Sequence, residues 1–190
     1  PFGGPCGRWA SVQRMAEGNS LLPRLVEIPG IFVDAIVVDP EQPRSGGAVL
    51  NPALTGEIRL PSTALQPLPA GIDRIVASRA AAEIRANDVV NIGVGMPIGV
   101  PGIVAERGMI DEVTFFPEHG SIGGVPAERA AFGANINPAA IIDSTNVFDF
   151  FCGGGLGISF LGFGQIDRFG NVNVSKFSGI VPGCGGFIDI

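Results

Sequence analysis

The fold is decided by the segment Val89-Val90-Asn91-Ile92-Gly93-Val94-Gly95-Met96-Pro97. Its first four residues are mostly β-branched and predict a short strand. The glycines that follow predict a tight turn, and Pro97 suits the first residue of a helix, a position that needs no backbone N–H. We expect this helix to reach about Arg107, with a bend at Pro101-Gly102.

The same alternation continues on both sides of this segment. Upstream, an amphipathic helix over residues 73–85 is predicted by apolar residues at helical spacing, namely Ile72, Ile75, Val76, Ala80 and Ile84. Downstream, residues 111–116 predict a second strand, which leads to Glu118. Such alternation indicates an α/β fold, with a mostly parallel sheet flanked by helices and glycine-rich loops at the strand ends. Sheets of this kind bind ligands at the carboxyl ends of their strands.

The remaining segments are less regular. Residues 144–151 predict a short helix, and residues 156–166 predict an apolar strand. A turn at residues 167–170 joins this strand to residues 171–174 and predicts a β-hairpin. Near the other end of the chain, residues 31–38 predict a strand that is buried on most of both faces.

Composition excludes several classes of function. The 190 residues suffice for one domain with a sizeable core, since 46% are hydrophobic and only 16% charged. A net charge of −6 argues against general nucleic-acid binding. No apolar stretch has transmembrane length, and no signal peptide precedes the first strand, so we expect no membrane association. The three cysteines have neither CxxC nor zinc-site spacing, which favours a reducing cytoplasm and no metal.

A carboxylate surrounded by glycine is the clearest chemical feature of the chain. It lies in the segment Glu118-His119-Gly120-Ser121-Ile122-Gly123-Gly124. A glutamate that is partly desolvated and faces backbone N–H donors suits nucleophilic attack on an acyl group. The alternative is a glutamate that only caps a turn beside a tight loop. His119 is the only histidine and lacks partners for a triad or a metal site, so we expect it to line a pocket or to act as scaffold.

A nucleotide-binding oxidoreductase is a further alternative, because Gly93-Val94-Gly95 follows a strand and opens a helix. The third glycine of the dinucleotide fingerprint would stand at position 98, which is Ile98, and Pro97 precedes it. The residues therefore fit a tight turn that offers amides to an anion, an acyl oxygen or a pantetheine chain better than a dinucleotide site.

Several motifs in order extend the interpretation beyond single residues. They are Pro23–Gly30, Leu54–Pro61, Val90–Pro97, Pro117–Pro126, Phe148–Leu156, Asp167–Ser175 and Gly183–Ile188. In this order and spacing the chain resembles the family I coenzyme A transferases from about Pro23 to its last residue, and above all the propionate and short-chain acyl-CoA:acetate CoA-transferases. One departure is Leu156-Gly157, where relatives usually carry Leu-Asp.

The resemblance implies a domain organisation. Residues 1–70 would be an irregular N-terminal segment and interdomain-type linker with one strand, since prolines recur from residue 39 to residue 70. Residues 71–190 would be the C-terminal-type, glutamate-bearing catalytic domain, incomplete at its C-terminus. Family members carry an N-terminal domain before this region and bind CoA where the two domains meet. We therefore expect a homo-oligomer or an assembly with an N-terminal-type domain.

The resemblance also implies a mechanism. Glu118 would attack the thioester of a short-chain acyl-CoA and become a glutamyl-CoA thioester, from which CoA passes to a carboxylic acid such as acetate or propionate. This exchange needs neither ATP, nor a metal, nor a permanently bound cofactor, because coenzyme A enters as the thioester substrate. The implied oxyanion or CoA-binding residues are Gly93, Gly95, Gly120, Gly185 and Gly186. The alternative is a non-catalytic CoA-transferase-like subunit or fragment that serves assembly.

Overall fold

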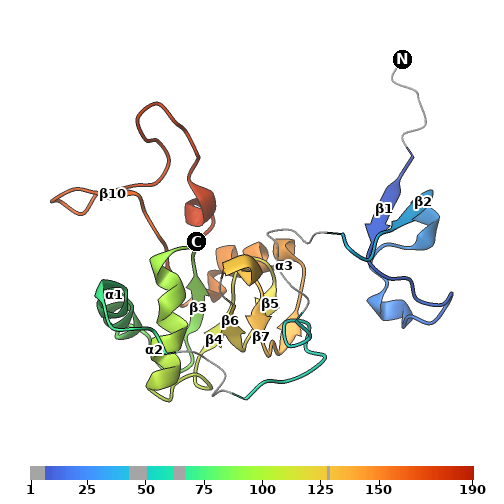
Figure 1. Ribbon diagram of the computed structural model, residues 1–190. Helices are drawn as coiled ribbons and strands as arrows, with labels where there is room; N and C mark the ends of the chain where they lie inside the picture. Colours follow the sequence, from blue (N-terminus) through green and yellow to red (C-terminus); the bar gives the residue numbers. More distant parts are fainter. Residues whose placement is uncertain (1–6, 43–50, 62–66, 128) are drawn as a thin grey trace. The chain divides into compact units, whose positions relative to one another are not determined.

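The structure is a computed structural model that describes residues 7–42, 51–61, 67–127 and 129–190. The chain divides into two compact units, Pro1–Ala48 and Val49–Ile190 (Figure 1). The division falls inside the proline-rich stretch of residues 39–70. All of the candidate site residues lie in the second unit.

The first unit contains a small parallel sheet. Strand β1 (Trp9–Val12) pairs with β2 (Ala35–Val38), and two short 3-10 turns, η1 (Pro23–Leu25) and η2 (Gly30–Phe32), lie between them in sequence. The predicted strand of residues 31–38 thus forms only in its second half. The expectation that it is buried on both faces is wrong, since Ile36, Val37 and Val38 are about half exposed. Two strands of four residues are too small to cover both of their own faces.

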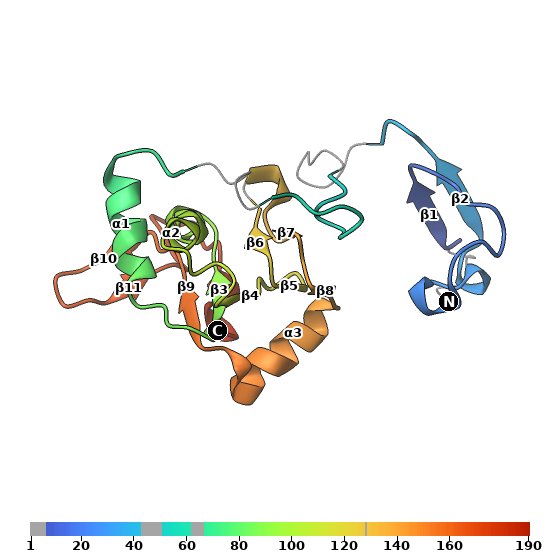
Figure 2. The same cartoon turned by 90° about the horizontal axis from the view of Figure 1, so that it is seen from below.

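The second unit is built on a three-stranded parallel sheet in the order β4-β3-β9 (Figures 1 and 2). Its central strand β3 (Val89–Ile92) is the strand predicted from the deciding segment. Strand β4 (Thr114–Phe115) is shorter than predicted, and β9 (Ile158–Phe160) occupies only part of the first half of the predicted apolar strand. This sheet confirms the α/β fold with a mostly parallel sheet.

Helices cover both faces of this sheet (Figure 2). On one face α1 (Ile72–Ala81) and α2 (Val100–Glu106) pack against Val90 and Ile92 of the central strand. On the other face α3 (Ser144–Phe150) contributes Val147 to a cluster that includes Val89. Alternate residues of β3 therefore point into two separate apolar clusters, as the twofold repeat of a strand requires.

Helix α1 differs from its prediction. It ends at Ala81 rather than at residue 85, and its fully buried residues are Ala77 and Ala81. The larger apolar residues Ile72 and Ile75 are 68% and 65% exposed. Helical spacing indicates that one face is apolar, but it does not say how much of that face a neighbour covers.

Helix α2 also begins differently. A 3-10 turn, η5 (Met96–Gly99), holds Pro97 in its first turn, and the α-helix proper starts after it with Pro101 in its own first turn. The bend expected at Pro101-Gly102 is thus replaced by a change of helix type before Pro101. Proline is tolerated in a first turn because its missing N–H would have no intrahelical partner there.

An ion pair joins these two helices. The Arg74 guanidinium donates from Nη1 to Glu106 Oε1 at 2.8 Å and to the Leu68 carbonyl at 2.8 Å. The hydrogen bond from Arg74 holds the pKa of Glu106 below its ordinary value. Glu106 therefore holds its negative charge to lower pH in the folded chain than in the unfolded chain.

Short antiparallel pairs complete the second unit. Strand β5 (Ser121–Ile122) pairs with β8 (Ala140–Ile141), and β6 (Val125–Pro126) with β7 (Asn135–Ile136). The predicted hairpin is confirmed as β10 (Gln165–Ile166) paired with β11 (Val172–Asn173). The short turns are η6 (Arg129–Ala131), the π-type turn η7 (Phe151–Gly155) after α3, and η8 (Gly185–Ile188) near the end of the chain.

Candidate active site

Glu118 follows β4 at the carboxyl end of the parallel sheet. Its strand is tied to the central strand by the Phe116 N–H, which donates to the Val90 carbonyl at 2.9 Å. The chain then turns sharply, because the Gly120 N–H donates back to the Pro117 carbonyl at 3.2 Å. The turn leaves Glu118 half-buried between a buried Pro117 and an exposed His119. This is the edge of the sheet at which α/β proteins bind ligands.

Two fully buried asparagines hold the ends of this loop, and sequence reasoning did not single out either of them. Asn91 donates from Nδ2 to the Phe116 carbonyl at 3.3 Å and accepts from Ser159 Oγ at 3.1 Å. Asn135 donates from Nδ2 to the carbonyls of Phe115 at 3.2 Å and Gly123 at 2.7 Å. The only sequence signal was an amide residue inside an otherwise apolar strand.

Asn135 thus joins the chain entering the Glu118 loop to the chain leaving it. A third carbonyl, that of Ser121, lies 3.4 Å from the same nitrogen. Its Oδ1 atom is buried and has no hydrogen-bond partner among the described residues. A buried amide with several carbonyl acceptors is a costly group to replace, because each acceptor would lose its donor.

A cavity of about 510 Å³ opens beside Glu118. It brings together the Glu118 carboxylate, Gly93 at the end of β3 and the loop Gly183–Gly186, which lies more than sixty positions further along the chain. The remaining lining residues are Ile92, Val94, Pro117, His119, Phe132, Leu161, Gly162, Val174, Pro182 and Phe187. The cavity therefore combines one carboxylate with a glycine loop in a mainly apolar wall.

Gly186 lies directly against the carboxylate. A Cβ atom built on Gly186 would be 2.5 Å from Glu118 Oε1, whereas ordinary contacts begin near 3.4 Å. A side chain at this position would therefore displace the carboxylate from where it lies. The N–H groups of Gly185 and Gly186, at the start of η8, have no hydrogen-bond acceptor within the described part of the chain. The Glu118 carboxylate and a loop with two unpaired backbone donors thus line the same small cavity.

The other predicted glycines have different surroundings. Gly93 lines the Glu118 cavity, but its N–H donates to the Phe160 carbonyl at 2.8 Å and continues the pairing of the sheet. Gly95 lines the neighbouring apolar cavity instead. Gly120 lines neither cavity, and its Cβ would be 1.9 Å from the Ile142 carbonyl oxygen. Its φ of +105° and this contact make glycine necessary for packing.

His119 has a structural environment. Its ring packs edge-on against Phe132, with centroids 5.9 Å apart, and lies over Gly133, where a Cβ would come within 2.5 Å of it. Cys184 lines the Glu118 cavity and Cys152 is exposed. Within residues 7–42, 51–61, 67–127 and 129–190, no group of three or more His, Cys, Asp or Glu side chains is arranged to hold a metal ion. Nor does any described helix combine the length and apolarity needed to cross a bilayer.

Comparison with known proteins finds relatives of the chain that are named as enzymes. The chain is 43% identical over 180 residues to acetate CoA-transferase YdiF of Escherichia coli K12, and 41% identical over 189 residues to caffeate CoA-transferase of Acetobacterium woodii. Each alignment covers 94% of this chain. The chain belongs to the coenzyme A transferase family. No protein-family model matches it.

Solved structures of CoA-transferases share the fold. The apoenzyme of the acyl-CoA transferase YdiF from Escherichia coli O157:H7 superposes with a TM-score of 0.80 at 42% identity, covering 96% of this chain. A second structure of that enzyme, a thioester complex with CoA, gives a TM-score of 0.79 at 40% identity. These matches confirm the resemblance to family I coenzyme A transferases.

The CoA-transferase relatives are longer than this chain. The chain spans 34% of acetate CoA-transferase YdiF and 36% of caffeate CoA-transferase. It also matches the acetate CoA-transferase subunit beta of Escherichia coli K12, at 33% identity over 125 residues, which are 60% of this chain and 56% of that subunit. The similarity thus includes relatives of both long and subunit-sized types.

Proposed function

We propose that this chain carries the nucleophile of an acyl-CoA:carboxylate CoA-transferase that acts on short-chain acids such as acetate or propionate. The observation that supports it is the convergence of the Glu118 carboxylate with the unpaired N–H groups of Gly185 and Gly186 in one cavity. This pairing of a carboxylate with backbone donors is what acyl transfer through an enzyme-bound intermediate requires.

The proposed first half-reaction forms a thioester on the protein. A Glu118 oxygen attacks the thioester carbon, and the tetrahedral intermediate expels CoA thiolate to leave an acyl-glutamyl anhydride. The thiolate then attacks the Glu118 carbonyl carbon and expels the substrate's carboxylate, which leaves glutamyl-CoA. A second carboxylate repeats these steps in reverse and leaves as the new acyl-CoA. The exchange begins and ends with a thioester of similar energy, so it needs no ATP, metal or resident cofactor.

Gly185 and Gly186 are the proposed oxyanion donors. Their N–H groups are preorganised at the start of η8 and have no competing acceptor among the described residues. One such donor is typically worth about 3–4 kcal/mol of barrier. Gly95 is proposed as a contact of the substrate beyond the thioester. We assign Gly93 to the wall of the cavity and Gly120 to the turn that presents Glu118.

The proposal includes a partner. We infer that residues 71–190 act as a C-terminal-type catalytic domain, in an assembly with an N-terminal-type domain or with further copies of the chain. Support comes from the large apolar residues that remain exposed on the second unit, such as Ile72, Ile75, Phe169 and Ile180. The similarity to a protein named as a subunit also supports assembly. The reducing cytoplasm is the proposed location, since Cys152 and Cys184 are free thiols.

Mass spectrometry of the intact chain tests the proposal. Incubation with propionyl-CoA should add one CoA to the wild-type chain and none to Glu118→Ala, with hydroxylamine removing the adduct. The same reaction is run with a CoA-transferase N-terminal domain added in trans. If neither reaction gives an adduct, the non-catalytic alternative replaces the proposed function.

A further inference from the structure

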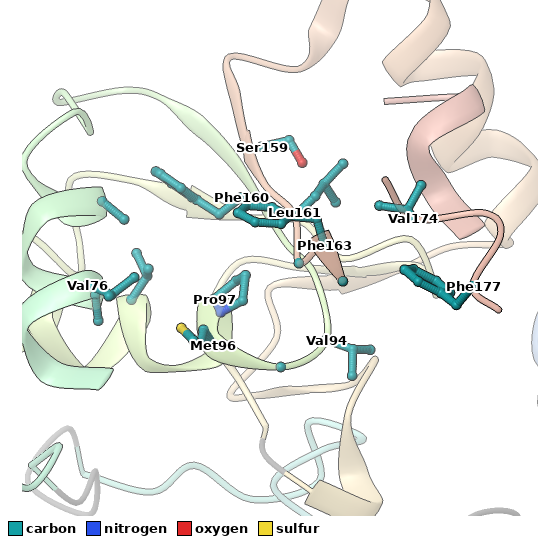
Figure 3. A pocket seen from close by; sticks show the side chains of 16 residues that line it. Val76, Val94, Met96, Pro97, Ser159, Phe160, Leu161, Phe163, Val174 and Phe177 are labelled. Atoms are coloured by element: carbon teal, nitrogen blue, oxygen red, sulfur yellow. The ribbon is translucent and has the colours of Figure 1, made fainter. Parts of the chain in front are cut away.

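A second and larger cavity adjoins the Glu118 cavity and is not used by the proposed chemistry (Figure 3). It has a volume of about 820 Å³ and lies between helix α1, the Val94–Pro97 turn and the segment that follows β9. The two cavities share four lining residues, which are Val94, Leu161, Gly162 and Val174. The larger cavity is therefore next to the site where a ligand bound at Glu118 would lie.

The side chains that line this cavity are almost all apolar. Among its sixteen lining residues, Ser159 alone has a polar side chain, and its hydroxyl donates to Asn91 Oδ1 at 3.1 Å. Figure 3 shows Phe160, Leu161 and Phe163 close together, with Val76 and Met96 contributed by other elements. No charged side chain lines the cavity. Its interior is suited to a hydrocarbon chain or ring.

The apolar side chains of this cavity distinguish the acyl chain of an acyl-CoA from its pantetheine arm. The pantetheine arm carries two amide groups, which lose free energy when they are buried without hydrogen-bond partners. The one polar side chain in the cavity has already committed its hydroxyl hydrogen to Asn91. The acyl arm is a hydrocarbon and needs no hydrogen-bond partner. The larger cavity therefore fits the acyl arm, and the glycine loop Gly183–Gly186 is left for the thioester end.

The volume of the cavity also bears on the size of the acyl group that it can hold. A water molecule, similar in size to a methyl group, occupies about 30 Å³. The methyl of an acetyl group or the ethyl of a propionyl group would fill a small part of 820 Å³. Sites that enclose whole ligands have volumes of about 300–1,000 Å³. We propose that this cavity is an acyl-chain subsite, and that it favours carboxylic acids whose apolar chains are longer than that of propionate. This inference rests on the proposed role of Glu118.

Binding of free carboxylates to the whole 190-residue chain tests it without any chemistry. Glu118→Gln serves as the host, because it removes the negative charge that would repel a carboxylate. Isothermal titration with acetate, propionate, hexanoate and octanoate should give one site whose affinity rises about fourfold per methylene, hence about 60-fold from propionate to hexanoate. Equal affinities along the series, or no binding of any acid, would overturn the inference.

A pair of variants on α1 locates the site. Val76 lines the cavity, whereas Ile75 on the same helix does not, and both are exposed enough to accept a phenyl ring without repacking the core. Val76→Phe should weaken hexanoate binding at least tenfold and leave propionate within twofold, while Ile75→Phe changes neither. Loss of hexanoate binding in both variants, or in neither, contradicts the assignment. Weaker binding of CoA itself to Val76→Phe would also contradict the assignment, because it would place the pantetheine arm in this cavity.

The outcomes separate this inference from the proposed function. Binding of acids to the Glu118→Gln host does not depend on a nucleophile. Chain-length-dependent binding without a CoA adduct on the wild-type chain would retain the subsite and reject the nucleophile. A CoA adduct together with binding that does not depend on chain length would retain Glu118 as the nucleophile and reject the acyl-chain subsite.

Discussion

Replacing Gly186 by alanine should displace the Glu118 carboxylate without lowering the stability of the fold. The added Cβ would lie 2.5 Å from Glu118 Oε1 and 3.0 Å from Ile190 Cδ1, both at the far ends of flexible side chains. The φ angle of Gly186 is not in the left-handed region, so alanine brings no backbone strain. The carboxylate must retreat by about 0.9 Å to restore an ordinary contact of 3.4 Å.

That displacement has a predictable kinetic effect. A misplacement of about 1 Å in a reacting group costs on the order of 100-fold in rate. We therefore expect Gly186→Ala to form the CoA adduct from propionyl-CoA about 100-fold more slowly than wild type, measured by intact-mass time courses. The melting temperature should stay close to that of wild type, because no core group is displaced.

Gly153→Ala is the matched control. Gly153 also has an ordinary φ, and its added Cβ meets no atom within 4 Å. Its adduct rate should stay within about twofold of wild type, since open space adds no steric cost. A Gly186→Ala rate within threefold of that control would refute the inferred contact between Gly186 and the nucleophile. Collapse of the melting transition in Gly186→Ala would show instead that the loop has a structural role.

Three further predictions follow from other contacts. Asn135→Ala removes the donor shared by the Phe115 and Gly123 carbonyls, so the free energy of unfolding, measured by urea titration, should fall by about 2–3 kcal/mol. An unchanged urea midpoint would contradict the role of Asn135. Gly120→Ala forces a Cβ to 1.9 Å from a backbone oxygen at a φ of +105°. The variant should therefore yield little folded protein by circular dichroism. A melting curve like that of wild type would show instead that the loop relaxes freely. Glu106 has a pKa below its ordinary 4.5 in the folded state, so its ion pair with Arg74 stabilises fully above about pH 5 and less as the pH falls through the lowered value. The melting temperatures of wild type and Glu106→Gln should therefore converge as the pH is lowered below 4.5, and a gap that stays constant as the pH falls would contradict the pairing.

Local patterns predicted the central elements well. The β3 strand, its glycine turn and the hairpin after residue 164 each depend on residues within a few positions of one another. Short-range sterics decide such elements, so the sequence contains enough information for them. The α/β class followed from their alternation.

Other features depend on residues far apart in the chain. The contact of Gly186 with Glu118 joins positions 68 apart, and no local pattern contains it; the family resemblance pointed to both positions, but not to their contact. The role of Asn135 was missed because its acceptors are backbone carbonyls, which leave no mark on the sequence. Helical spacing in α1 predicted an apolar face, although Ile72 and Ile75 remain largely exposed on the unit by itself.

The most direct test of the account is to locate the CoA adduct on a single residue. The wild-type chain is incubated with propionyl-CoA, together with a CoA-transferase N-terminal domain, then treated with hydroxylamine, digested and sequenced by tandem mass spectrometry. We expect a hydroxamate on Glu118 and on no other carboxylate, because Glu118 is the one carboxylate among the described residues that line the cavity of the glycine loop. A hydroxamate on another residue, or none after turnover has been demonstrated, would contradict the assignment of Glu118 as the nucleophile.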